Sequence, residues 1–257
     1  MTFEPRPYQV KALNDIWQSI QENLSTLAQL PTGAGKTIIF SKIIQRLLRE
    51  NHAFRVLVLV DREVLVRQTA DKLCKVAPEL ALSIGFYCAS VSKIKDGDNP
   101  VTIASRQTLI NGLDDFPFVN LIILDEAHLC RIPTDEDTEE DKDQIQKIIE
   151  RLRQYNPKTR LFGCTATPYR LSQGYIYGNK NTRGCLPYFP ELNHKTNVSS
   201  LMADGFLCQL QAKTIISQET QNALDNVKLT AGEYNLAYLA STMMQGVHIK
   251  TAVETWK

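Results

Sequence analysis

Short apolar runs alternate along this chain with longer stretches whose apolar residues repeat at helical spacing. Residues 9–23, for example, place Ile16 and Ile20 one turn apart, as an amphipathic helix does. Helices are predicted over residues 9–23, 38–49, 62–76 and 143–154. Strands are predicted over residues 26–30, 55–60, 101–104, 121–124 and 160–164, and the Val-rich second one suits a strand buried on both faces. Because the two types alternate, we predict an α/β fold with a doubly wound, mostly parallel sheet over roughly residues 1–190.

The pattern after Pro168 is less regular. Residues 171–190 are rich in Gly, Tyr and Asn, which favours a hairpin or an extended loop. Residues 198–204 predict a short helix that Gly205 ends. We predict a last strand over residues 207–216 and a partly helical remainder, with helix over 234–244 and 247–256.

Composition and charge argue against a strongly basic nucleic-acid-binding protein, a membrane protein and a secreted protein. The 257 residues include 29 Lys and Arg against 28 Asp and Glu, so nucleic acid can be bound only through a local patch. The apolar runs are far shorter than the roughly 20 residues that span a bilayer, and the N-terminus lacks the apolar core of a secretory signal. The six cysteines show no metal-ligand spacing. We therefore expect reduced thiols in a cytoplasmic protein that does not enter membranes.

A glycine-rich segment between a predicted strand and a predicted helix indicates a phosphate site. Gly33 and Gly35 would let backbone N–H groups surround phosphate oxygens, Lys36 would neutralise the β- and γ-phosphates, and the Thr37 hydroxyl would ligate Mg²⁺. Leu30 stands where the strict P-loop pattern has its first glycine. The alternative interpretation is a glycine turn before a helix, with an accidental lysine.

A second motif supports the nucleotide interpretation. The apolar strand at 121–124 ends in Asp125 and Glu126, at the edge where an open α/β sheet places its ligand. Asp125 would hold Mg²⁺, and Glu126 would polarise the attacking water. Taken alone, the two carboxylates would also fit a solvated turn. Both motifs in this order and context favour a nucleoside triphosphatase.

Together these segments resemble the motifs of superfamily 2 helicases and translocases. Residues 31–37 (PTGAGKT) resemble motif I, in which the leading glycine is often absent, 125–128 (DEAH) resemble motif II, and 165–167 (TAT) resemble motif III. Residues 6–9 resemble the adenine-reading segment, 58–68 motif Ia and 102–109 motif Ib. Over about residues 4–216, the likeness is nearest to type III restriction motors and RadD-like repair helicases, through 165–171 and 174–178.

The resemblance implies a RecA-like P-loop fold and assigns roles to single residues. Glu126, Lys36 and Asp125 would be catalytic, with Glu126 as base and with Thr37 and Asp125 as Mg²⁺ ligands. ATP would be held by Arg6, Tyr8, Gln9, Pro31, Thr32, Gly33, Ala34, Gly35, Lys36, Thr37, Asp125, Glu126 and His128, with Gln9 on the adenine. His128 would couple the nucleotide to Thr165, Ala166 and Thr167. The strand-binding groove would include Arg62, Gln68, Ser105, Gln107 and Thr108.

Several of these segments also fit structural interpretations. Tyr8 and Gln9 would start a helix after Pro7, Arg62 would be a surface charge, and residues 105–108 would form an ordinary turn. The acidic run at 135–143 suits a solvated loop and a helix N-terminus better than a metal site. The aromatic residues of the less regular region could stack on bases but fit a local core better; these are Tyr175, Tyr177, Tyr188 and Phe189.

The expected function is that of the ATP-binding half of an ATP-dependent DNA helicase or translocase in repair or restriction. Alternatives are a nucleotide-dependent binding module without unwinding and an RNA helicase; a small-molecule kinase is disfavoured because it has no use for the DEAH and TAT motifs. Residues 1–216 would form the RecA-like domain, and 217–257 a linker toward a second RecA-like domain that this chain lacks. We expect ATP·Mg²⁺ binding with poor turnover, because that second domain would supply the arginine finger.

Overall fold

Seven parallel strands form the central sheet of the computed structural model. In chain order they are β1 (Ser25–Gln29), β2 (Val56–Val60), β3 (Ile84–Tyr87), β4 (Val101–Ser105), β5 (Leu121–Asp125), β6 (Arg160–Thr165) and β9 (His194–Lys195). Their spatial order is β3-β4-β2-β5-β6-β1-β9, and each neighbouring pair is parallel. The predicted α/β class and mostly parallel sheet are therefore confirmed.

The structure describes residues 4–91, 97–134, 138, 142–171, 173–179 and 187–208, and the paired strands β10 (Leu229–Thr230) and β11 (Glu233–Tyr234). The chain divides into two compact units, Met1–Leu207 and Cys208–Lys257, and the first carries the sheet. Most of the predicted strand at 207–216 and of the helices at 234–244 and 247–256 lies outside the described residues. The boundary at residue 216 also lies there, and it stays a prediction.

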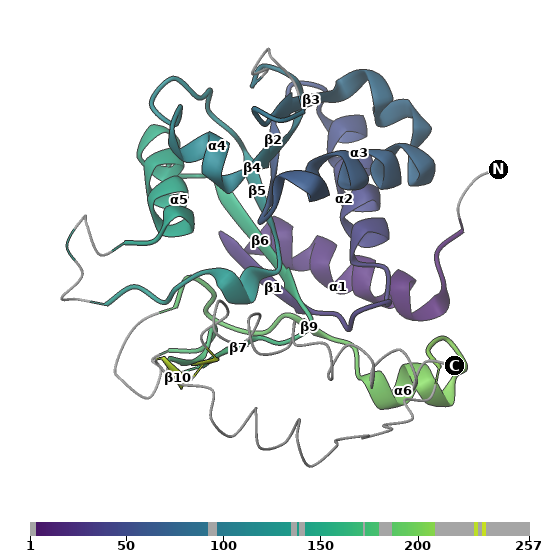
Figure 1. Ribbon diagram of the computed structural model, residues 1–257. Coiled ribbons are helices and arrows are strands. Elements are labelled where there is room, and N and C mark those ends of the chain that lie inside the picture. Colours follow the sequence, from purple (N-terminus) through teal and green to yellow (C-terminus); the bar gives the residue numbers. More distant parts are fainter. Residues whose placement is uncertain are drawn as a thin grey trace, which may run out of the picture. The chain divides into compact units, whose positions relative to one another are not determined.

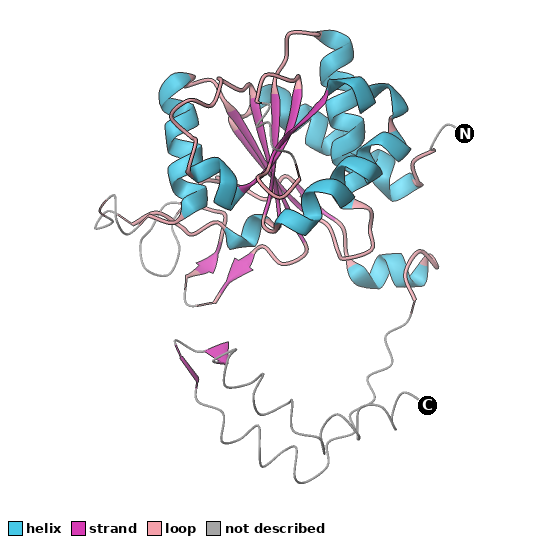
Figure 2. Ribbon diagram, turned by 45° about the horizontal axis from the view of Figure 1, so that its top comes forward, coloured by secondary structure: helices cyan, strands magenta, loops and turns pink. Residues whose placement is uncertain are grey.

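Helices cover both faces of the sheet (Figures 1 and 2). On one face lie α1 (Pro7–Glu22), α2 (Lys36–Glu50) and α3 (Glu63–Val76), and on the other lie α4 (Arg106–Ile110) and α5 (Gln144–Tyr155). Short 3₁₀ turns follow α3 (η1, Pro78–Ser83) and β5 (η2, Ala127–Leu129), and α6 (Val198–Ala203) comes after β9. Among the described residues, every helix is too short or too polar to cross a bilayer.

The strand β2 shows why the sheet is covered on both sides. All five of its residues are buried, and Val58 belongs to the core cluster under α1–α3, whereas Leu57 and Leu59 belong to the cluster under α4–α5. Successive side chains of a strand point to opposite faces, so an unbroken Val/Leu run requires an apolar layer on each. The expected burial of this strand is confirmed.

One glycine in the sheet is required by close packing. A Cβ on Gly163 of β6 would lie 2.5 Å from Phe189 Cζ and 2.9 Å from Ala127 Cβ. Such distances exclude a side chain unless the neighbours move. Gly163 therefore lets the 187–190 segment and the turn after β5 pack against β6.

Some of the observed helices and strands confirm the predictions, whereas others had not been predicted. The helix α6 ends before Gly205, which has φ +72°, as predicted. Asp143 caps α5 by accepting a hydrogen bond of 2.8 Å from the Gln146 N–H, which fits the helix-N-terminus interpretation of the acidic run. A hairpin of β7 (Tyr169–Arg170) and β8 (Gly174–Tyr175) overlaps only the start of the hairpin or extended loop predicted over residues 171–190, and its first strand lies before that range. The edge strand β3 and the short helix α4 were not predicted.

Candidate active site

The glycine-rich loop joins β1 to α2 in the conformation that a phosphate-binding loop needs. Gly33 and Gly35 have φ values of +84° and +83°, in the region that favours glycine, and α2 begins directly afterwards at Lys36. A Cβ on Gly35 would also lie 2.6 Å from Gln9 Nε2. Both glycines are therefore needed to aim the start of α2, with its free N–H groups, at the position of a phosphate.

Residues of the N-terminal segment hold this loop in place through hydrogen bonds. The Tyr8 hydroxyl and Gln9 Nε2 each donate a hydrogen bond of 3.0 Å to the Ala34 carbonyl. Gln9 Oε1 accepts from the Arg6 N–H at 2.9 Å, and the Gln9 side chain is buried. Gln9 thus caps α1 and holds the loop at once. Its role in reading adenine, and those of Arg6 and Tyr8, stay predictions.

Two carboxylates follow β5, next to this loop. Lys36 Nζ forms an ion pair of 2.9 Å with Glu126 Oε1, and Glu126 itself adopts the left-handed region with φ +55°. Asp125 accepts a hydrogen bond of 3.1 Å from the Glu126 N–H. Burial raises the pKa of Asp125 above its usual range and Glu126 raises it further, whereas Lys36 opposes both effects. The sheet thus brings together the lysine and the acid pair that the sequence predicted, from segments about ninety residues apart.

A chain of polar contacts leads away from the acid pair. His128 Nδ1 lies 3.4 Å from Glu126 Oε2 and 2.9 Å from Thr165 Oγ1, at the end of β6. Thr165 Oγ1 in turn accepts a hydrogen bond of 3.2 Å from the Thr167 N–H. Ala166 joins the same region, because its carbonyl accepts from Gln29 Nε2 at 3.3 Å. The residues predicted to couple motifs II and III are therefore in contact, and their coupling role stays a prediction.

A cavity of about 610 Å³ lies between the glycine-rich loop and the acid pair Asp125–Glu126. From the predicted set it is lined by Thr32, Gly33, Gly35, Lys36, Thr37, Asp125 and Glu126. Pro31 and Ala34 belong to the same loop, but they are buried and do not line the cavity. Such a volume lies within the range of small-ligand sites. The phosphate-binding and acidic motifs therefore share one cavity.

Two lysines of this cavity were not predicted from the sequence. Lys72 and Lys75 of α3 line it together with Ile38 and Val76, and the charge of Lys72 opposes the rise in the pKa of Asp125 that burial and Glu126 cause. Their positions depend on the packing of α3 beside α2, which no local pattern reveals. The one available signal was their spacing of three residues, which places them on one helix face. They add positive charge to the wall beside the phosphate loop.

The donor set fits a magnesium ion. Thr37 and Asp125 line the same cavity and offer a hydroxyl and a carboxylate oxygen. Mg²⁺ prefers oxygen ligands and completes its shell with water and phosphate oxygens, so two protein ligands suffice. Among the described residues, no cluster of three His, Cys, Asp or Glu side chains offers an alternative metal site.

The described cysteines form no disulfide bond and belong to no candidate metal cluster. The five described ones, Cys74, Cys88, Cys130, Cys164 and Cys208, are free thiols. Burial raises the pKa values of Cys130 and Cys164 well above the usual range, which keeps these two protonated. The reduced state expected for all six thiols stays a prediction.

The predicted strand-binding residues divide into exposed and buried ones. Arg62, Gln68 and Gln107 are exposed. Ser105 and Thr108 are buried, and their hydroxyls hydrogen-bond each other at 3.0 Å where Ser105 caps α4. This arrangement favours the turn interpretation for these two. Contact of the exposed residues with nucleic acid stays a prediction.

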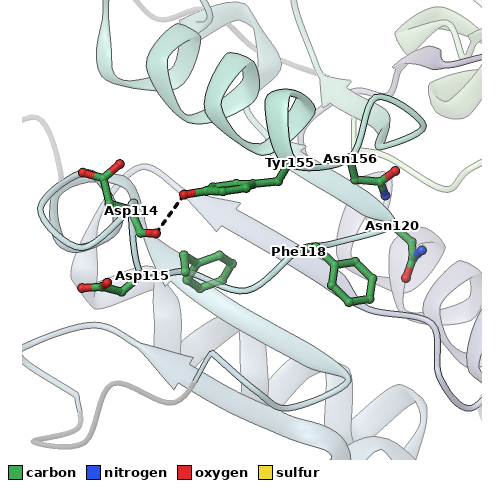
Figure 3. A pocket seen from close by; sticks show the side chains of 7 residues that line it. Asp114, Asp115, Phe118, Asn120, Tyr155 and Asn156 are labelled. Atoms are coloured by element: carbon green, nitrogen blue, oxygen red, sulfur yellow. Dashed lines mark hydrogen bonds between the residues drawn. The ribbon is translucent and has the colours of Figure 1, made fainter.

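A second cavity lies at the amino-terminal ends of the strands, opposite the nucleotide cavity, beside the segments that precede β5 and β6 (Figure 3). It measures about 590 Å³ and is lined by Asp114, Asp115, Phe116, Phe118, Asn120, Tyr155 and Asn156. The Tyr155 hydroxyl donates a hydrogen bond of 2.9 Å to the Asp114 carbonyl, as the dashed line shows. No residue predicted to bind nucleotide or nucleic acid lines this cavity.

Comparison with known proteins places the chain in a family. Residues 2–170 match the model of the family "Type III restriction enzyme, res subunit". The chain belongs to this family. The resemblance to superfamily 2 is thereby confirmed, and proteins of this kind use ATP.

Relatives and solved structures extend the comparison. The chain is 28% identical over 251 residues to IRC3 of Saccharomyces cerevisiae, whose name assigns it to the ATP-dependent helicases; the match covers 93% of this chain and 32% of IRC3. The chain thus spans about a third of that relative.

Two solved structures share the fold. One is the Type ISP restriction-modification enzyme LlaGI, a nuclease-deletion mutant in complex with a DNA substrate mimic, with a TM-score of 0.52 and 16% identity over 98% of this chain and 24% of that one. The other is the Sulfolobus solfataricus SWI2/SNF2 ATPase core in complex with dsDNA, with a TM-score of 0.50 and 21% identity over 65% of this chain and 33% of that one. The likeness is one of fold, and the predicted RecA-like fold is confirmed.

Proposed function

We propose that this chain is the ATP-binding half of an ATP-dependent DNA helicase or translocase that acts in repair or restriction. The observation that carries the proposal is the single cavity that the phosphate loop and the acid pair line together. The loop without the acids would suit many nucleotide-binding proteins. The acids beside it add the groups that hydrolysis requires.

The side chains suit distinct steps of ATP hydrolysis. The start of α2 and Lys36 bind the β- and γ-phosphates through backbone N–H groups and one charge. Glu126 orients the attacking water and accepts its proton, once the triphosphate competes for Lys36 and loosens the 2.9 Å ion pair. His128 contacts both Glu126 and Thr165, so a shift of the Glu126 side chain would move His128. Thr165 and Thr167 pass it on toward the nucleic-acid contacts.

Thr37 and Asp125 would hold Mg²⁺. Bound there, the ion would neutralise charge on the phosphate oxygens. The raised pKa of Asp125 fits a carboxylate whose charge the protein alone balances only in part.

Efficient turnover needs a second RecA-like domain in this proposal. The phosphates would otherwise be contacted from one side only, and the charge that develops in the transition state would lack an arginine finger. The 257-residue chain alone should therefore bind ATP·Mg²⁺ and hydrolyse it poorly. We assign the second domain and the finger to the rest of the motor.

A nucleotide-dependent clamp is the second candidate function. Its support is the contact between His128 and Thr165, which would transmit nucleotide binding whether or not hydrolysis follows. An RNA helicase would use the same residues, because phosphate contacts of this type do not read a 2′-hydroxyl.

ATPase activity of the intact protein separates these functions. Hydrolysis would be measured alone and with single-stranded DNA, duplex DNA or RNA at one fixed salt concentration. A DNA motor predicts stimulation by DNA well above that by RNA. Stimulation by RNA alone would support the RNA helicase, and strand binding with no hydrolysis at all would support the clamp.

A further inference from the structure

A hairpin with two tyrosines follows the Thr165–Thr167 segment, and a third tyrosine, Tyr177, comes directly after it. Strands β7 and β8 pair antiparallel, with Tyr169 opposite Tyr175. Figure 2 shows the hairpin projecting from the sheet and its helices. The family match ends at residue 170, so β8 lies beyond it. None of the roles assigned to the active-site motifs involves this hairpin.

The three rings form a row from the core to solvent. Tyr177 packs against the core cluster under α4–α5, and the Tyr175 ring lies 5.3 Å from it between centroids. The Tyr169 ring follows at 5.6 Å, edge-on to Tyr175 with an interplanar angle of 81°. Tyr169 and Tyr175 remain 47% and 57% exposed, so the local-core interpretation of Tyr175 is wrong. Tyr177 thus anchors a row whose two outer rings offer aromatic surface to a ligand.

The hairpin is fastened to the segment behind the acid pair. Arg170 Nη1 donates a hydrogen bond of 2.6 Å to the Leu129 carbonyl, in η2. Gln173 exchanges two hydrogen bonds of 3.4 Å with the backbone of Ile132. Because η2 also contains His128, the rings are mounted on the segment that touches Glu126 and Thr165. A rigid mounting lowers the entropy lost when the rings bind a ligand.

The exposed rings point to the kind of ligand. Between Glu150 and Glu191 the chain has no acidic residue. Of the basic residues in this stretch, Arg151 pairs with Asp114 at the other end of the strands, and Arg170 is the one in the hairpin. Exposed aromatic rings on a segment without acidic side chains suit single-stranded nucleic acid, whose flat bases are open to stacking.

We propose that Tyr169 and Tyr175 stack on bases of a single strand of nucleic acid, which gives this protein a base-contacting site beside its phosphate-contacting groove. The proposal rests on the nucleic-acid-dependent function above. Every base has a π-face, so such stacking holds a strand without reading its sequence. Because the hairpin is hydrogen-bonded to η2, which contains His128, the affinity for the strand would depend on the bound nucleotide.

The test compares strands with and without bases. The intact protein is titrated with a fluorescein-labelled thymidine oligonucleotide and with an equally long abasic oligonucleotide, which keeps the phosphates. We expect the wild type to bind the thymidine strand roughly tenfold more tightly, within the range measured for stacking on aromatic residues. Tyr175→Ala and Tyr169→Ala should lower that preference several-fold, and Tyr175→Phe should retain it because phenylalanine still stacks.

Tyr155→Ala serves as the matched control. Tyr155 has an exposed fraction of 46%, similar to that of Tyr169. It lies far from the hairpin in the fold, at the cavity on the opposite end of the strands. It should leave the base preference unchanged. ATP affinity, measured in parallel, confirms that each variant is folded. A uridine strand repeats the comparison for RNA, and loss of preference on either strand type supports the proposal.

Two results would overturn the stacking role while leaving the proposed function standing. In one, the alanine variants keep the wild-type preference for bases and DNA still stimulates hydrolysis. In the other, the variants lose turnover with unchanged base preference, which would assign the rings to contact with another domain. A wild type that binds no strand and shows no stimulation would refute both proposals together.

Discussion

The nucleotide cavity and the predicted strand-binding residues lie at the same edge of the sheet but are built differently. Around the cavity, Lys36, Glu126, His128 and Thr165 contact one another in series across the ends of β1, β5 and β6. Of the strand-binding set, the exposed members Arg62, Gln68 and Gln107 follow β2 or β4. Hydrolysis needs groups held in fixed geometry, whereas backbone contacts to a polymer work as many separate weak ones. Substitutions should therefore act strongly at the cavity and weakly along the groove.

Replacement of the proposed base should give the largest effect. Glu126→Gln keeps the shape of the side chain but removes proton acceptance, so kcat of the intact protein should fall by about 10²- to 10⁴-fold. ATP affinity should change little. Steady-state hydrolysis and a titration with a fluorescent ATP analogue measure the two separately. Glu22→Gln, on the exposed side of α1, is the control, and surviving turnover in E126Q would refute the assignment of the base.

Loss of the phosphate-loop lysine should come next. Lys36→Ala removes a charge-assisted contact to the phosphates, so ATP affinity should drop by roughly 10- to 100-fold. Lys42→Ala on the same helix does not line the cavity and should leave affinity unchanged. An equal affinity for ATP in K36A and the wild type would mean that the triphosphate does not bind at this loop.

The two unpredicted lysines should have a smaller effect. Lys72→Gln and Lys75→Gln weaken the field around the triphosphate, and each should lower ATP affinity roughly twofold to fivefold, less at high salt. Adenosine, which lacks phosphates, should bind K72Q as it binds the wild type. Lys11→Gln is the control, since Lys11 is exposed on α1 and paired with Asp15. If adenosine and ATP lost affinity equally, the lysines would be acting through structure rather than charge.

The smallest effects should separate exposed from buried groove residues. Arg62→Ala should weaken strand binding about twofold and reduce the salt dependence by about one phosphate contact. Ser105→Ala should leave strand binding unchanged and instead lower the free energy of unfolding by about 1 kcal/mol, because it removes the cap of α4. Fluorescence titration at several salt concentrations and urea denaturation provide the two measurements. A larger loss of strand binding in S105A than in R62A would reverse this division.

The sequence predicted the parts of the fold that repeat a strong local pattern. The run at 55–60 was enough to identify a doubly covered strand, and strand ends at 30 and 124 were enough to bring Lys36 and Asp125 to one edge. The edge strand β3 was missed because its four residues are only alternately buried and include Gly85. The contact of Gln9 with Ala34 and the burial of Thr108 arise from packing between segments distant in sequence, which a local pattern cannot reveal.

ATP binding by the 257-residue chain tests the central claim most directly. A calorimetric titration with ATP in the presence and absence of Mg²⁺, followed by a hydrolysis assay with single-stranded DNA, would compare binding with turnover in one preparation. We predict one Mg²⁺-dependent ATP site and only weak hydrolysis, whether or not DNA is added. No ATP binding would contradict the nucleotide site, and robust DNA-stimulated hydrolysis would contradict the claim that this chain is half of a motor.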